Sequence, residues 1–390
     1  MKKQYLILLL TLGSVVACVK PYDFDPLSYE KVLVIDGAVT NEPGPYEVSI
    51  TYTFPLEETS AETVADAQVW VMDGAGLRTD FSSSESGVYT SPPAFRGVVG
   101  NRYSLFVEMP DGSLYTSDEQ LLKASPEIDS IYGKYAQLPN DADEQNVGGI
   151  QFFIDSHDDT GETRHYRYEW EEAYKIQVPY PAHYEVVVSD TDTVIVPLDT
   201  PKGICYQEYY SNSLIYGTSV GSRENRMAEF PVRFVSEKLP HLRTRYALLV
   251  KQYAISESAY LFYKRLRENN ESGGSLFDKQ TGSIFGNIHA VDNAEQSVLG
   301  YFEVSGVSSK RRFFYNRDLD ERLRAGHFPY SCLYTERIST VPDSAYYYLQ
   351  IYDGNIYALY TFPPSVDIYS RGCTDCSFYA EVIPPDYWVN

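Results

Sequence analysis

Positive charge is scarce in this chain. Its 390 residues include 32 Lys and Arg against 54 Asp and Glu, which gives a formal net charge of −22 at pH 7. Proteins that bind nucleic acid gather positive charge on one face or along one helix. An acidic chain is also repelled by anionic membrane surfaces. We therefore exclude nucleic acid as a partner.

Catalytic motifs are also missing. The sequence contains no H-E-x-x-H, no G-x-S-x-G, no P-loop and no dinucleotide-binding fingerprint, and its six His form no close metal-binding pair. The acidic segment 155–162 does not have the spacing of a calcium loop, so we expect a surface turn there. We expect a protein that is not an enzyme and that has no metal or cofactor.

Long hydrophobic runs are absent as well. The apolar stretch Tyr5–Leu12 follows Lys2 and Lys3, and it is shorter than the ~20 residues that a membrane-spanning helix needs. A basic start, a short apolar core and small residues after it are typical of an export signal. We place this signal at residues 1–17.

The signal ends at a cysteine. Val15-Val16-Ala17-Cys18 resembles the bacterial lipobox, and this resemblance implies that the Cys18 thiol carries fatty acyl chains such as palmitate. Two or more chains anchor a protein stably where one does not. Residues 18–29 would then be a lipid-anchored tether at the outer membrane, with the body facing either the periplasm or the outside. The alternative is an ordinary secretory signal that happens to hold a cysteine.

The body of the chain has the pattern of a mainly β protein. Short alternating segments such as "YEVSITYTF" and the turn signal Asp111-Gly112 predict about seven strands over residues 30–124. This spacing is typical of an immunoglobulin-like β-sandwich. Residues 125–390 are predicted to form a larger β-rich domain.

One α-helix is expected within the second domain, near residues 256–271. Ser256 is a suitable N-cap, and Glu257 falls in the first turn. Apolar residues recur after it at helical spacing, and Gly273 and Gly274 follow the last of them.

Four cysteines remain after Cys18: Cys205, Cys332, Cys373 and Cys376. An even number in an exported chain favours disulfides. Four cysteines allow three pairings, and we expect bridges that tie the C-terminal tail to the body, with Cys373–Cys376 as the preferred local bridge. A zinc site is the weaker alternative, because it would need a second close pair.

Tyrosine is unusually frequent, with 36 residues. Tyr suits half-buried strands, and it also suits stacking against sugars or peptides at a binding face. If the protein binds a ligand, our candidates are aromatic residues near the tail and in Tyr-rich loops. These are Tyr209, Tyr210, Tyr330, Tyr387 and Trp388. Core packing is the alternative for each.

Three blocks of sequence carry a family resemblance. They are "KVLVIDGAVTNEPGPYEVSIT" after the lipobox, the segment from "VKQYAISESAYLFYKRLRENN" to "GYFEVSGVSSKR", and the tail "GCTDCSFYAEVIPPDYW". Together they resemble a Bacteroidota family of outer-membrane lipoproteins that contain a domain of unknown function, DUF4249. The resemblance covers nearly the whole mature chain. Family members are often encoded beside SusC-like, TonB-dependent transporters, and no catalytic residues can be carried over.

The resemblance and the anchor together suggest a function. We expect a non-catalytic binding or accessory component that works with a TonB-dependent transporter in nutrient capture. The alternatives are a structural or adhesive envelope protein and, less favoured, a surface hydrolase of glycans or peptides. A hydrolase would need two carboxylates or a metal set that converge in a cleft.

Overall fold

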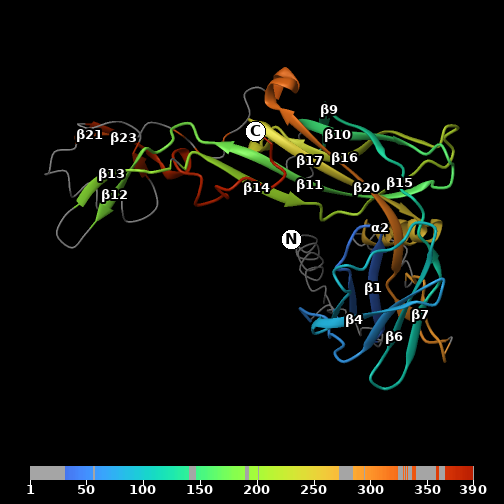
Figure 1. Cartoon of the computed structure of the whole chain (residues 1–390). Helices are drawn as coiled ribbons and strands as arrows, with labels where there is room; N and C mark the ends of the chain where they lie inside the picture. Colours follow the sequence, from blue (N-terminus) through green and yellow to red (C-terminus); the bar gives the residue numbers. More distant parts are fainter. Residues whose placement is uncertain are drawn as a thin grey trace, which may run out of the picture.

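The protein is described here as a computed structural model of the whole chain (Figure 1). Its described residues are 31–55, 58–139, 146–188, 193–200, 202–271, 284–293, 295–323, 336–339, 357–359 and 365–389, with Phe328, Tyr330 and Cys332. The signal 1–17, the tether and Cys18 lie outside them. The predicted mainly β fold with one α-helix is confirmed for the described residues. None of the helices described has the length and apolar character to cross a bilayer.

The first part of the chain forms one β body. Its strands are β1 Leu33–Thr40, β2 Glu47–Tyr52, β3 Gln68–Asp73, β4 Arg78–Glu85, β5 Val88–Thr90, β6 Arg102–Glu108, β7 Leu114–Ser117 and β8 Gln120–Leu121. The alternation of buried and less buried side chains along the sequence explains these strands. In β6, Tyr103, Leu105 and Val107 are buried while their neighbours are not, as period-two side chains require. The immunoglobulin-like arrangement itself stays a prediction.

Later residues complete this first body. Strands β18 Ile288–Ala290 and β19 Val298–Leu299 pair with β7 and β1, and the start of β20 Phe302–Tyr315 runs parallel to β1. Ile288, Val298, Phe302 and Val304 are buried in the same core as β1 to β7. The body therefore includes residues from far beyond position 124.

The second body is built from two packed sheets. One holds β9 Ile128–Leu138, β10 Val147–His157 and β16 Arg226–Ser236. The other holds β11 His165–Gln177, β14 Ile204–Tyr210, β15 Ile215–Thr218, β17 Arg245–Ile255 and β20. Phe152 of the first sheet stacks on Tyr246 of the second, with ring centroids 5.2 Å apart. These rings lie in one continuous core between the sheets.

Strand β20 joins the two bodies. Its first residues pair with β1, and the rest pair with β17, so the two bodies share one long sheet that Figure 1 shows running from the lower to the upper part. At the junction, buried Glu303 accepts hydrogen bonds from Arg167 of β11 at 2.9 Å and from the Tyr263 hydroxyl at 2.7 Å. The buried carboxylate of Glu303 is therefore paired at the junction.

The helix α2, Glu257–Glu271, lies near this junction (Figure 1). The Ser256 hydroxyl accepts a hydrogen bond from the Ala259 backbone N–H at 3.1 Å, which is the N-cap interaction expected from the sequence. Ala259 is buried against Tyr253, Ile255 and Tyr301.

A small sheet lies at the far end of the second body in Figure 1. Its strands are β12 Tyr184–Val188, β13 Thr193–Pro197, β21 Glu336–Ser339, β22 Tyr357–Leu359 and β23 Ser365–Ser370. The loops of the second body contain short 3-10 helices, at Pro240–Leu242, Asn316–Asp318, Glu321–Leu323 and Arg371–Cys373. The chain then ends in a tail with little regular structure, 371–389.

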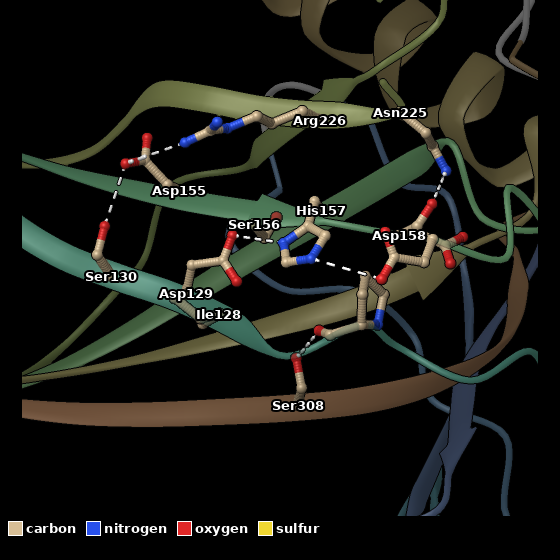
Figure 2. A network of polar contacts seen from close by, with 12 residues as sticks. Ile128, Asp129, Ser130, Asp155, Ser156, His157, Asp158, Asn225, Arg226 and Ser308 are labelled. Carbon is tan, nitrogen blue, oxygen red and sulfur yellow. Dashed lines mark hydrogen bonds and ion pairs between the residues drawn. The ribbon is translucent and has the colours of Figure 1, made fainter. Parts of the chain in front are cut away.

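A polar network holds the start of β9 and the end of β10 together (Figure 2). His157 and Asp129 lie 2.7 Å apart from Nδ1 to Oδ2, and this contact raises the pKa of His157. Asp158 accepts hydrogen bonds from the backbone N–H groups of Thr160 and Thr163 at 2.9 and 2.8 Å. The carboxylate of Asp158 therefore organises the loop after β10 as a turn.

Candidate functional site

Two disulfides fasten the tail to the second body. Cys205 of β14 is bonded to Cys376, and Cys332 is bonded to Cys373. The prediction of disulfides that tie the tail to the body is confirmed. The predicted local bridge Cys373–Cys376 is wrong. The turn that holds both cysteines lies against two other segments, and each cysteine is bonded to the cysteine of one of these segments.

Backbone contacts continue this attachment. Tyr206 and Glu381 exchange two N–H···O bonds, of 2.7 and 3.0 Å, so the tail adds a short bridge to the edge of β14. Trp388 is buried near the end of the tail and packs edge-on against Tyr206 and Phe313, with ring centroids 5.0 and 5.4 Å apart. The tail is thus held at both ends, and two cavities lie beside it.

The first cavity has a volume of about 300 Å³ and a mainly aromatic wall. Ligand sites of small molecules usually range from about 300 to 1,000 Å³. The rings come from β11, β14, the 3-10 helix Pro240–Leu242 and the tail region. They are Tyr174, Tyr209, His241, Phe328, Tyr330 and Tyr379.

Three of these rings pack together with nearly parallel planes. The His241 centroid lies 4.2 Å from that of Tyr174 and 5.5 Å from that of Tyr209, with planes tilted by 25° and 21°, and the two tyrosine centroids are 6.2 Å apart. The Tyr174 hydroxyl donates to the Gln207 side chain at 2.5 Å. Nearly parallel rings packed in this way give a flat aromatic wall.

A buried ion pair supports the stack from behind. Arg233 donates to both carboxylate oxygens of Glu172 at 2.8 and 2.7 Å, and the Tyr246 hydroxyl donates at 2.5 Å. Burial alone would raise the pKa of Glu172, but hydrogen bonds from His241, Arg233 and Tyr246 outweigh it and lower that pKa to about 2. Glu172 is therefore a carboxylate at neutral pH.

His241 links this ion pair to the cavity. Its Nε2 lies 3.4 Å from Glu172, while its Nδ1 is buried and has no hydrogen-bond partner. The residue is only 6% exposed. A buried polar atom without a partner is uncommon and costs free energy unless something satisfies it.

Two cations also line the first cavity. The Arg243 guanidinium lies over the Phe328 ring, 4.6 Å from its centroid, and Lys175 lies on β11. In the described part of the chain, neither side chain has a carboxylate within ion-pair distance, and burial lowers the pKa of Arg243. The cavity wall is therefore locally positive in an acidic protein.

The second cavity is a larger groove of about 920 Å³ beside the tail. Its wall includes Tyr210, Tyr387 and three carboxylates, Glu208, Glu381 and Asp386. Burial and the hydrogen bond to Glu208, at 2.6 Å, raise the pKa of Tyr387, and Arg311 lies 3.4 Å from the centre of its ring. Gln207 and Tyr379 belong to both cavities.

The structure brings the five predicted ligand residues to one region. Tyr209 and Tyr330 line the first cavity, and Tyr210 and Tyr387 line the groove. Trp388 is a core residue. Sequence reasoning missed Tyr174, His241 and Arg243. The aromatic alternation in "EEAYKIQ" marked Tyr174 only as a strand residue, and nothing local marked the other two.

Metal chemistry finds no support in the residues that can be examined. Across the described ranges, no three His, Cys, Asp or Glu side chains come together as a metal site would require. The described residues that line the first cavity include no carboxylate. This wall presents flat rings, amide groups and positive charge.

Comparisons with known proteins place this mainly β protein with a disulfide-fastened tail in a family. The chain matches the family described as "Domain of unknown function (DUF4249)" over residues 19–311. The protein belongs to the DUF4249 family. No curated protein matches it.

Solved structures give little further information. One match is the crystal structure of a DUF4785 family protein from Legionella pneumophila, which is 8% identical. The match covers 56% of this chain and 51% of that chain, so this chain spans about half the length of that protein. Its TM-score is 0.17, and we draw nothing from it.

Proposed function

We propose that this protein is a lipid-anchored binding protein of the outer membrane that captures a small molecule and works with a TonB-dependent transporter. The aromatic cavity beside the tail carries this proposal, because its wall is rigid, mostly apolar and provided with a few polar groups. These are the usual properties of a small-molecule site. The two disulfides that hold the tail support an oxidising, exported location.

The anchor and the partner rest on other observations. The lipobox-like Val15-Val16-Ala17-Cys18 supports acylation of Cys18. The neighbourhood of transporter genes in the DUF4249 family supports the partner.

Co-purification from native outer membranes tests the proposal. The full-length protein would be tagged at its C-terminus, extracted in mild detergent and analysed by mass spectrometry. We expect a TonB-dependent transporter among the recovered proteins, and we expect its recovery to fall sharply for Cys18→Ala. Recovery of the protein without any such transporter, in chemically cross-linked extracts as well, would contradict the proposal.

A further inference from the structure

We propose that the aromatic cavity binds a small molecule in which a flat ring is joined to a carboxylate. This inference rests on the proposed binding function and specifies the ligand of that same cavity. It is carried by a flat aromatic wall and by two cations that have no acidic partner among the described residues.

The wall selects for a flat ring. His241 and Tyr174 are nearly parallel and are both almost fully buried, so the stack is held in place before any ligand enters. Tyr330 and Tyr379 contribute further ring surface, with centroids 5.2 Å apart. Stacking between rings in offset or tilted geometry stabilises a complex beyond the burial of area alone.

The cations select for an anionic group. The Arg243 guanidinium lies over the Phe328 ring, 4.6 Å from its centroid, and a guanidinium has five N–H donors that a contact with a ring face does not use up. Lys175 lines the same cavity. A carboxylate accepts two parallel hydrogen bonds from such an edge, and this is among the stronger polar contacts in proteins.

The contrast with the rest of the protein strengthens this argument. The chain has 22 more acids than bases, and two other part-buried arginines, Arg167 and Arg233, donate to Glu303 and Glu172. Arg243 lacks such a partner among the described residues. A carboxylate on the ligand would supply the missing charge.

His241 offers a second polar contact to such a ligand. Its Nδ1 is buried without a partner and the ring lines the cavity. A donor or acceptor on the ligand ring, or a water held by the ligand, would satisfy this atom. The cavity thus combines a flat surface, a positive group and one unsatisfied polar atom.

Isothermal titration calorimetry on the purified full-length protein tests the inference. The probes are indole-3-acetate and indole-3-acetamide, which have almost the same shape but differ in charge. We expect the acetate to bind about tenfold more tightly than the amide, since one charge-assisted interaction is gained. We expect Arg243→Gln to abolish this preference and Arg243→Lys to retain part of it.

The matched control is Arg78→Gln. Arg78 also stacks on a ring, that of Trp70 at 3.9 Å, but it lies on β4 of the first body. This variant should keep the full preference for the acetate. If Arg243→Gln fails to fold, as judged by circular dichroism, Lys175→Gln takes its place and should weaken the same preference.

Three results would overturn the inference: equal binding of acetate and amide, no binding of either probe up to its solubility limit, or an equal loss of preference in Arg78→Gln. Each leaves co-purification with a transporter unaffected, so failure of the ligand assignment is distinguishable from failure of the proposed function. Conversely, if no transporter is recovered but the preference for the acetate persists, the proposed function fails and the ligand assignment stands.

Discussion

At the scale of single residues, buried Glu172 supports the cavity wall. Glu172 is 1% exposed and is held by Arg233, Tyr246 and His241. Breaking a buried pair by removal of one partner leaves the other charge uncompensated, which costs more than the pair contributes in total. The carboxylate therefore matters to both the stability of the second body and the position of His241.

The variant Glu172→Gln tests this role. We expect it to lower the free energy of unfolding by about 3 kcal/mol at neutral pH, because the Arg233 charge loses its partner. Urea unfolding followed by fluorescence would measure this. The control Glu62→Gln removes an exposed partner of Lys31 and should change the free energy of unfolding by less than about 0.5 kcal/mol.

The lowered pKa of Glu172 predicts that the stability of the protein depends on pH. The folded-state pKa of Glu172, about 2, lies below its usual value of 4.5. A lowered pKa stabilises the folded state above the unfolded pKa, and this stabilisation disappears as the pH falls through the folded pKa. The stability gap between wild type and Glu172→Gln should therefore narrow between about pH 4.5 and pH 2. A gap that stays constant across this range would contradict the prediction.

At the scale of elements, the tail is the least regular part of the site and depends on covalent ties. The Cys205–Cys376 bridge spans 171 residues and Cys332–Cys373 spans 41. In the chain-entropy description, a disulfide that closes the longer loop removes more freedom from the unfolded chain. The longer bridge also lies directly beside the Tyr206–Glu381 backbone contact.

The double variant Cys205→Ala/Cys376→Ala should release the tail from β14. We expect a loss of about 4 kcal/mol in the free energy of unfolding and rapid chymotryptic cleavage near Phe378 and Tyr379. Peptide mass spectrometry after a timed digest would detect the cleavage. The matched variant Cys332→Ala/Cys373→Ala should lose less stability, and equal losses from both variants would contradict this account.

Local signals predicted the elements well where the cause is local. The helix follows from the Ser256 cap, and β6 follows from alternation. The disulfide pairing could not be predicted in this way. Cys376 lies beside Lys202, whose carbonyl accepts its backbone N–H at 3.0 Å, and this contact brings it to Cys205. Which segments meet is a long-range property that the spacing of a C-x-x-C motif does not contain.

The candidate site shows the same limit. The aromatic surplus near the tail pointed to Tyr209 and Tyr330, and both line the cavity. Arg243 gave no signal, because an arginine without a carboxylate partner can be recognised only once its neighbours are known. The predicted role of these residues in binding stays a prediction.

At the scale of the whole molecule, the two bodies are interleaved in sequence. The first core contains buried residues from Leu33 to Leu122 together with Ile288, Val298, Phe302 and Val304. Full burial of each such side chain contributes about 1.5–3 kcal/mol. The four together therefore approach the whole stability of a typical domain, about 5–15 kcal/mol. A boundary near residue 124 does not isolate a complete core.

A fragment of residues 31–124 should therefore fail to unfold cooperatively. Linking residues 284–307 to its C-terminus should restore a sharp thermal transition, because β18, β19 and the start of β20 regain their positions. Calorimetry on the two fragments would measure the difference. A sharp transition in the shorter fragment alone would show that its core is sufficient.

Native mass spectrometry of the protein, extracted directly from its own cells, tests the central claim. We predict that wild-type protein carries a small organic acid and that the variant Tyr209→Ala/Arg243→Gln, extracted in parallel, has lost it. If wild type and variant carry the same bound mass, or if both are free of ligand, the cavity beside the tail is not the binding site.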